Sequence, residues 1–377
     1  MVKNNCSVIF PRPLRNILII RLSALGDVAM TIPVVYSLCE AYPDVNFTML
    51  TTPVISRIFI NRPDNLKIYP AEIRGRHRGI KGIYVLYKEL RALSFDGIAD
   101  LHNVLRSRLL CALLRLSGVK SIHINKGRIA KCEITARRHK KLRQLPTSFH
   151  RYTDVFRKLG FSFPENFVSI YGKQKAALPE ILLSEFSSEE HCIGVAPFAK
   201  HQGKIYPEKK MEQLISMLAK TGEYKIFLFG GGEKESLVLN RWASDFPDKV
   251  VSLTNMKLGF SGELALMSHL KLLVSMDSAN MHLASLVGLP VISVWGATHP
   301  YAGFLGWRQS LDNVVQLDLP CRPCSIFGNR PCWRNDYACL NEISPEEIAD
   351  KIKKEIENML RSLERVKDKI KPDEYDY

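Results

Sequence analysis

The feature that most constrains the fold is a junction in which a short, fully apolar run ends abruptly and a helical pattern begins. The apolar run 273–276 stops at Asp277 and Ser278, and His282 follows about one turn into the next helical segment. Strands that are apolar throughout are typical of parallel sheets buried on both faces. The junction therefore predicts a parallel α/β sheet that binds ligands where strand ends meet helix N-termini.

A similar junction near the N-terminus puts a second acidic residue at a strand end. Residues 16–23 form a continuous apolar run, the turn 24–27 ends in Asp27, and a helical pattern covers 28–38. Both acids could simply cap their helices and His282 could be a core histidine, which spacing alone makes the more common explanation. Further runs that predict strands are 45–50, 95–102, 192–196, 225–229 and 291–294.

Charge is distributed unevenly along the 377 residues, whose formal net charge is +15. Residues 1–180 contain 30 Lys and Arg against 12 Asp and Glu, whereas residues 181–377 contain 23 against 26. This asymmetry predicts an anionic partner for the first half. Nucleic acid is disfavoured, because Phe149 is the only aromatic residue between Lys120 and His150 and no finger or RNP-type motif is present.

Length and composition predict two α/β domains joined by a polar linker. The 46% apolar content suffices for two hydrophobic cores, and residues 172–190 are polar and contain proline. We expect a Rossmann-like domain at 1–178, a second at 190–343, and a helix at 344–366 that docks on the domains. Its capping box spans 344–347, and its apolar stripe consists of Ile348, Ile352, Ile356, Met359 and Leu363.

Localisation and cysteine usage set further expectations. No segment approaches the roughly 20 uninterrupted apolar residues of a membrane-spanning helix, and residues 1–5 are not followed by the apolar core of a secretion signal. A cytoplasmic protein is expected, which disfavours disulfides. Cys321, Cys324, Cys332 and Cys339 could suit a structural zinc, but one Cys-x-x-Cys with two isolated cysteines is a weaker signal than paired motifs. We therefore assign no metal ligand and no cofactor.

Five dispersed blocks, in this order, resemble glycosyltransferase family 9, the bacterial heptosyltransferases of lipopolysaccharide core assembly. The blocks are 21–28 with Pro33, 100–108, Lys204 followed by Tyr206 and Pro207, the glycines 230–232 with Glu233, and 277–284 followed by 288–290. The resemblance implies a GT-B arrangement, in which two Rossmann-like domains face each other across a cleft. It also implies inverting transfer of heptose from ADP-L-glycero-D-manno-heptose to a lipopolysaccharide or lipooligosaccharide core acceptor.

The resemblance further implies roles for single residues. Asp27 is expected to act as the catalytic base, and Lys204 to neutralise the leaving diphosphate without a metal ion. Glu233 is expected to bind the ribose, and the main chain of Leu258 to lie by the adenine. Donor binding is also expected of Asp277, Ser278, Ala279 and His282. An anionic glycolipid acceptor at the cytoplasmic membrane face is expected to contact Arg106, Arg137, Arg138, Lys140 and Lys141.

Three alternatives remain open. A transferase of the same fold could use another nucleotide sugar. A dinucleotide-dependent oxidoreductase is disfavoured because no Gly-x-Gly-x-x-Gly follows the strand 17–20. A binding protein without chemistry is disfavoured because Asp27 and Lys204 are both present. We expect a monomer that is cytoplasmic or peripheral on the inner membrane.

Overall fold

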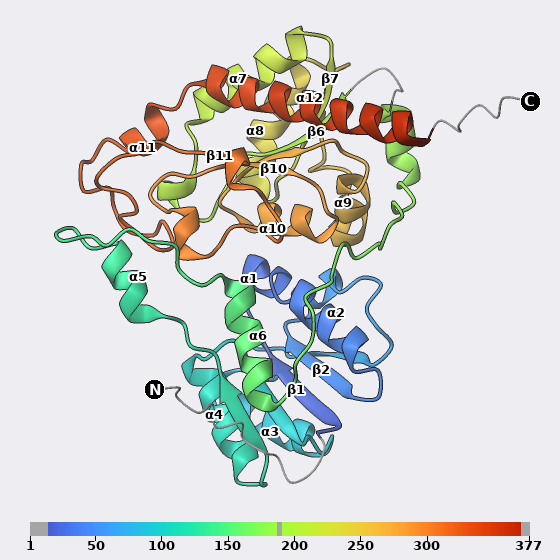
Figure 1. Cartoon of the computed structure of the whole chain (residues 1–377), viewed down its shortest axis with the longest axis vertical. Coiled ribbons are helices and arrows are strands. Elements are labelled where there is room, and N and C mark those ends of the chain that lie inside the picture. Colours follow the sequence, from blue (N-terminus) through green and yellow to red (C-terminus); the bar gives the residue numbers. More distant parts are fainter. Residues whose placement is uncertain (1–13, 187–190, 371–377) are drawn as a thin grey trace, which may run out of the picture.

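Two parallel sheets form the centres of two domains, one above the other in Figure 1. The computed structural model describes residues 14–186 and 191–370, and the side chains of these except 363 and 365–370. The sequence predictions for residues 1–5, 187–190 and the side chain of Leu363 lie outside this range. The strand orders are β3-β2-β1-β4-β5 and β11-β10-β9-β6-β7-β8. Both sheets therefore contain the 3-2-1-4-5 order of the Rossmann fold.

The first domain is built from a continuously apolar first strand that is covered on both faces. Ile17 and Ile19 pack with α2 and α6, whereas Leu18 and Ile20 pack with α3 and α4. Its elements are β1 (Asn16–Ile20), α1 (Leu25–Ala29), α2 (Ile32–Ala41), β2 (Asn46–Thr51), β3 (Leu66–Pro70), α3 (Gly79–Arg91), β4 (Gly97–Asp100), α4 (Leu105–Arg115), β5 (Lys120–His123), α5 (Arg128–Ile134) and α6 (Ser148–Leu159).

The second domain repeats this plan. One face of its sheet is covered by α7, α8 and α12, and the other by α9 and α10, whose buried residues share one hydrophobic cluster with α2 and α6 of the first domain. Its elements are β6 (His191–Ala196), α7 (Glu208–Lys220), β7 (Tyr224–Leu228), α8 (Glu233–Ser244), β8 (Val250–Ser252), α9 (Gly259–Met267), β9 (Leu273–Met276), α10 (Ala279–Leu286), β10 (Val291–Val294), β11 (Val314–Val315), α11 (Ala338–Asn341) and α12 (Pro345–Ile370).

The predicted turn after the first strand differs from the structure. Residues 25–29 form the short helix α1, and the helix predicted over 28–38 is divided in two, with α2 beginning at Ile32. Pro33 explains the division, because it has no N–H to donate and its ring would clash with the carbonyl of Ala29 in a continuous helix. At the second position of α2 the missing donor costs nothing.

The described part of the predicted linker is not an extended tether. It includes a 3₁₀ turn, η2 (Glu180–Glu185), in which Leu182 is buried and the Glu185 carboxylate pairs with Lys225 Nζ at 2.8 Å. The two separate sheets are consistent with the domain limits expected from the sequence. Those limits remain a prediction. In the part of the chain that the structure describes, no helix has the length and apolarity required to span a bilayer.

The terminal helix α12 begins at Pro345, and the Ser344 hydroxyl accepts a hydrogen bond from the Glu347 N–H at 3.1 Å, as the capping box predicts. Ile348, Ile352 and Ile356 are buried in the core of the second domain. The helix crosses the outer side of this domain, far from the first domain in Figure 1. Its apolar stripe therefore anchors it to one domain.

We expect Ile352→Ala to lower the free energy of unfolding by about 2–5 kcal/mol, because the side chain is fully buried and its loss leaves a cavity. Urea unfolding followed by tryptophan fluorescence measures this change. Leu360→Ala on the same helix is the control, since Leu360 is 41% exposed and its loss should cost no more than about 0.5 kcal/mol. Equal effects of the two substitutions would contradict the docking of α12 through this stripe.

Candidate active site

A cleft of about 540 Å³ lies between the two domains. The first domain lines it with residues 24–27 and Met30, and the second with residues that follow β6, β7 and β9. The carboxyl ends of parallel strands from both sheets thus open onto one cavity, where open α/β sheets usually bind ligands. Of the residues predicted from the sequence, those that line this cleft are Asp27, Lys204, Asp277, Ser278, Ala279 and His282.

Asp27 lies at the first-domain wall and is held by a buried arginine. Its Oδ2 is 2.7 Å from Arg21 Nη2 and accepts a hydrogen bond from the Ala24 N–H at 3.3 Å. Burial would raise the pKa of Asp27, but the Arg21 charge and the Ala24 N–H outweigh burial and lower it below its usual value. The carboxylate therefore stays ionised in mildly acidic solution, and its side chain, 31% exposed, remains accessible from the cleft.

The opposite wall carries a lysine whose ammonium is also paired. Lys204 Nζ is 2.7 Å from Asp277 Oδ2, and the two side chains are 15% and 4% exposed. Lys204 ends the 3₁₀ turn η3 (Gln202–Lys204) after β6, whereas Asp277 directly follows β9. The pair holds a positive charge at the cleft surface, close to where an anionic ligand would enter.

The N-terminus of α10 opens onto the same cavity. Ser278 is its N-cap residue in an extended conformation, and Ser278, Ala279 and Asn280 all line the cleft. The first N–H groups of a helix have no partner within the helix, and its dipole places partial positive charge there. Together with Lys204, this end of the helix is suited to a phosphate group.

His282 lies one turn into α10 and is buried against the first domain. Burial lowers its pKa to about 4, with Asp277 and Asp27 opposing the shift and Lys204 adding to it, so the imidazole is neutral near pH 7. Its Nδ1 is buried without a hydrogen-bond partner. A satisfied core histidine would pair this nitrogen, so His282 differs from one, and its ring lines the cleft.

Two predicted nucleotide contacts lie away from these groups. Glu233 is the first residue of α8 and is exposed, whereas Glu235 two positions later lines the cleft and accepts a hydrogen bond from the Gly231 N–H at 2.8 Å. Leu258 is the N-cap residue of α9 and is not among the residues that line the cleft. Neither Glu233 nor Leu258 is thus brought next to Lys204 in this cavity.

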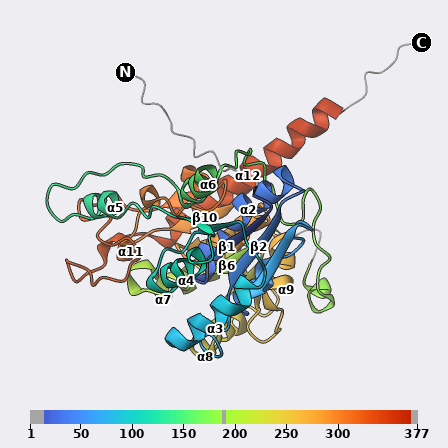
Figure 2. The ribbon, with the colours of Figure 1, turned by 90° about the horizontal axis from the view of Figure 1, so that it is seen from below.

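The predicted acceptor-binding cations divide into two groups. Arg106 on α4 donates a hydrogen bond to the His77 carbonyl at 2.8 Å, within the first domain. The other four follow α5, where Lys140 Nζ donates to the Pro323 carbonyl of the second domain at 3.1 Å and the Arg137 guanidinium lies 5.6 Å from the centroid of the Trp333 ring. Arg138 and Lys141 are exposed. Both views place α5 on the same side as α11 (Figures 1 and 2).

Two charged residues were not singled out from the sequence. Arg21 directly follows β1 and is the one charged residue in the predicted run 16–23, which could have identified it, and it orients Asp27. Lys131 on α5 lies 4.4 Å above the ring of Phe304, a cleft residue. Burial, reinforced by Arg151, lowers the pKa of Lys131 to about 8. In the sequence, Lys131 could not be distinguished from the many neighbouring cations, so its position at the cleft was not predicted.

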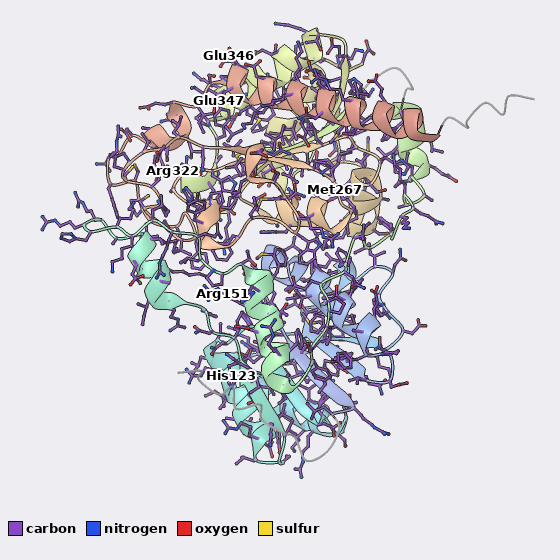
Figure 3. The ribbon with its side chains drawn as sticks, in the orientation of Figure 1. His123, Arg151, Met267, Arg322, Glu346 and Glu347 are labelled. Atoms are coloured by element: carbon purple, nitrogen blue, oxygen red, sulfur yellow. The ribbon has the colours of Figure 1, made fainter. Side chains whose placement is uncertain are left out.

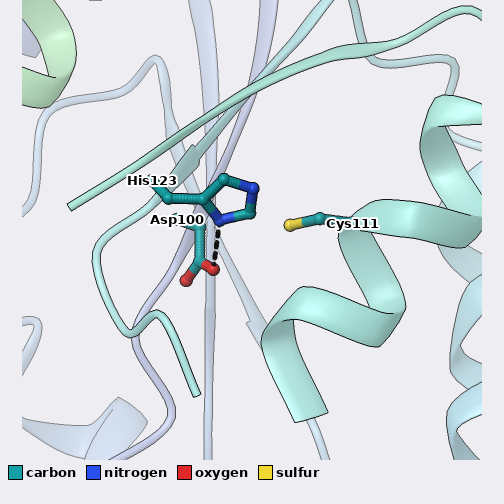
Figure 4. Close-up of side chains that lie close together, drawn as sticks. All are labelled: Asp100, Cys111 and His123. Carbon is teal, nitrogen blue, oxygen red and sulfur yellow. Dashed lines mark hydrogen bonds and ion pairs between the residues drawn. The ribbon is translucent and has the colours of Figure 1, made fainter. Parts of the chain in front are cut away.

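A cluster at the end of β4 has the residue types of a metal site but is explained by hydrogen bonding. Within the described residues, Asp100, Cys111 and His123 are the one trio whose ligand atoms lie within 4.8 Å of one another (Figure 4). Asp100 Oδ2 contacts Ser107 Oγ at 2.9 Å and His123 Nδ1 at 2.8 Å. Its Oδ1 accepts from the N–H groups of His102 and Asn103. Asp100 thereby holds the turn that starts α4.

Two facing Rossmann-like domains that both line the cleft between them form the GT-B arrangement seen in glycosyltransferases. The sequence model of glycosyltransferase family 9 (heptosyltransferase) matches residues 83–330. The chain belongs to this family, and the resemblance and GT-B fold predicted from the sequence are confirmed.

Relatives and solved structures agree over most of the chain. Lipopolysaccharide heptosyltransferase 3 of Escherichia coli is 25% identical over 78% of this chain and 84% of its own length. Lipopolysaccharide heptosyltransferase 1 of Campylobacter coli is 23% identical over 89% of this chain and 98% of its own length. The family 9 structure from Veillonella parvula has a TM-score of 0.70 at 17% identity. The match covers 91% of this chain and 98% of that structure's chain. E. coli heptosyltransferase WaaC with ADP has a TM-score of 0.64 at 20% identity. The match covers 90% of this chain and 99% of the WaaC chain.

We expect Arg21→Gln to raise the pH at which transfer activity is lost on the acidic side. In the native protein the lowered pKa of Asp27 keeps the carboxylate ionised, so the acidic limb of kcat/KM should lie below about pH 4, the range of an ordinary aspartate. Without Arg21 the effect of burial remains, and the pKa of Asp27 rises. The pH profile of kcat/KM measures the shift.

Two control variants separate charge from folding. Arg21→Lys keeps a cation beside Asp27, so its acidic limb of kcat/KM should lie closer to the native pH than that of Arg21→Gln. Arg157→Gln breaks an exposed pair with Asp154 and should leave the limb unchanged. Melting temperatures report whether each variant folds, since removing one partner of a buried pair can cost about 3–5 kcal/mol. An unchanged acidic limb in folded Arg21→Gln would contradict the role of Arg21.

Proposed function

We propose that this protein transfers heptose from ADP-L-glycero-D-manno-heptose to a lipopolysaccharide or lipooligosaccharide core acceptor, with inversion at the anomeric carbon. The observation that carries the proposal is the placement of Asp27 and Lys204 on opposite walls of one cleft. Membership of family 9 and the names of the curated relatives support the sugar and the acceptor. The similar WaaC structures with ADP and with ADP-2-deoxy-2-fluoro heptose support the nucleotide.

The donor occupies the second domain in this proposal. Its diphosphate lies at the N-terminus of α10, where Ser278 and Ala279 line the cleft, and Lys204 provides the point charge. Asp277 orients the Lys204 ammonium, and the His282 ring, which lines the cleft, contacts the donor. Glu233 and Leu258 remain our proposed contacts to the ribose and adenine. Glu235 is a further candidate for the ribose because it lines the cleft.

The chemical step needs a base on the acceptor side and a cation on the leaving-group side. Asp27 accepts the proton of the acceptor hydroxyl as that oxygen attacks the anomeric carbon from the face opposite the ADP. Because its pKa is lowered, Asp27 is a weak base, and proton transfer accompanies bond formation in an oxocarbenium-like transition state. Lys204 and the α10 amides stabilise the charge that grows on the diphosphate, so this role requires no metal ion.

The acceptor binds the basic first domain in this proposal. An anionic glycolipid at the cytoplasmic membrane face would be attracted by Arg106, Arg137, Arg138, Lys140 and Lys141, at about 1 kcal/mol for each cation near the surface. Lys131 is added to this set, because it reaches the cleft edge at Phe304. We further propose that the protein acts as a monomer and is cytoplasmic or peripheral on the inner membrane.

The decisive test of the proposed chemistry is Asp27→Asn. Transfer turnover at saturating donor and acceptor should fall by about 10²–10⁴-fold, as for removal of a positioned base. Asparagine has nearly the same size and can still accept the Ala24 N–H hydrogen bond. A purely capping role therefore predicts almost no kinetic effect.

Two controls accompany this measurement. The affinity for ADP, measured by titration calorimetry, should remain close to the native value because the donor half is untouched. The melting temperature shows whether the variant folds, since asparagine leaves the buried Arg21 charge without its partner. Turnover near the native rate, with both controls intact, would remove Asp27 from the reaction and reduce it to a helix cap.

The acceptor assignment is tested at Arg138 and Lys141, which are exposed, because Arg137 and Lys140 contact the second domain. We expect the double variant Arg138→Glu and Lys141→Glu to raise the acceptor KM by about tenfold or more. The salt dependence of KM should weaken with the lost charges, and ADP affinity should not change. Lys353→Glu with Lys354→Glu on α12, also exposed, is the matched charge reversal. Similar effects of both double variants would show that only net charge matters.

A further inference from the structure

The segment between β11 and α12 brings four cysteines to one small cavity. Residues 316–344 contain little regular structure besides the four-residue helix α11. Loops of this length inside a compact domain need support of their own. A cavity in this segment is lined by Cys321, Cys324, Cys332 and Cys339, together with Arg322 and five of the residues between Cys332 and Cys339. Figure 3 labels Arg322 on this side of the second domain, next to α11.

We propose that Cys321, Cys324, Cys332 and Cys339 bind one thiophilic metal ion, zinc or iron, as a tetrathiolate site that fixes this segment. The spacing is Cys-x₂-Cys-x₇-Cys-x₆-Cys, which begins with the short loop that places two thiolates on one ion. Four sulfur ligands select zinc or iron among biological metals. This proposal revises the expectation from the sequence that no residue binds a metal, because spacing alone did not show that the four side chains share a cavity.

The four thiols are available for such a bond. All four are free, and their polar contacts are weak: Cys324 Sγ is 3.8 Å from the Ala297 carbonyl, and Cys332 Sγ is 3.8 Å from Asp336 Oδ1. No three of these sulfurs lie within 4.8 Å of one another. An ion would therefore draw them inward by rotation of side chains that already line its cavity.

Charge around the cavity also favours a bound anionic centre. A divalent ion with four thiolates carries a net charge of −2, which is costly to bury without cations. Arg322 is 4% exposed and donates to main-chain carbonyls, including Gly296 at 2.5 Å and Thr298 at 2.9 Å. Among the described residues no carboxylate lies within ion-pair distance of it, and Asp318 acts on its charge only from farther away, so a bound anionic centre would supply the close counter-charge. Lys140, bonded to the Pro323 carbonyl, supplies a second cation.

The segment matters because it forms one wall of the active-site cleft. Phe327 lines the cleft, and a Cβ atom added to Gly328 would lie 2.7 Å from Cγ of Lys204. The Gly328 backbone, at φ +70°, therefore supports the side chain that we assign to the diphosphate. Contacts of Lys140 with Pro323 and of Arg137 with Trp333 join the same segment to the first domain. A metal ion here would act as a positioning element, separate from the chemical step.

Elemental analysis of the full chain tests the proposal without any activity measurement. The protein is purified under reducing conditions without a metal-affinity column, and zinc and iron are quantified by mass spectrometry. We expect about one equivalent of zinc or iron per chain. The double variant Cys321→Ser and Cys332→Ser should retain less than about a tenth of that amount. Cys132→Ser, which removes an exposed thiol on α5, should retain the full amount.

A second measurement keeps the test valid if the double variant does not fold. Native protein is stripped of metal with a chelator and titrated with Co²⁺, whose absorption identifies tetrahedral thiolate coordination. Saturation at about one equivalent supports the site. The proposal is overturned by native protein that contains neither zinc nor iron and gives no cobalt–thiolate absorption. It is equally overturned by full metal content in a folded double variant.

Discussion

The close approach of α1 to α10 is the contact on which the active site depends. Gly26 lies against His282 of the other domain, and a Cβ atom at this position would be 2.8 Å from His282 Cδ2 and 3.4 Å from the Ala279 Cα. A side chain at residue 26 would require the buried His282 ring to move, so glycine permits this close approach. The contact brings the strand ends of both sheets to one cleft. In the proposed mechanism, this contact lets Asp27 reach a sugar held by the second domain.

Each wall of the cleft contains one ion pair, and the two pairs present opposite charges to a ligand. On one side Arg21 keeps Asp27 ionised, and on the other Asp277 holds the Lys204 ammonium at the surface. Each ion pair combines a strongly buried partner with one that is more exposed to the cleft, so the more exposed charge is fixed in position before substrate arrives. The proposed base and the proposed phosphate-binding cation are thus supplied by different domains, which fits a reaction between an acceptor and a nucleotide-linked donor.

Much of the fold could be predicted because it depends on local patterns. The runs 273–276 and 291–294 are the strands β9 and β10, since continuous apolar sequence is characteristic of a buried parallel strand. The start of α12 followed from Ser344 and Pro345. What could not be predicted depends on residues that are distant in sequence. The pairing of Lys204 with Asp277, the contact of Lys131 with Phe304 and the cavity shared by four cysteines all require the folded chain.

The proposed reaction is the inverting transfer of heptose from ADP-heptose in this cleft. The most direct measurement offers ADP-heptose, and separately UDP- and GDP-sugars, to the protein with extracted core glycolipid, followed by mass spectrometry of the product and NMR of the new linkage. The account predicts one added heptose, from the ADP donor, with anomeric configuration opposite to that of the donor. A product formed only from a UDP- or GDP-sugar, or a linkage that retains the donor configuration, would contradict it.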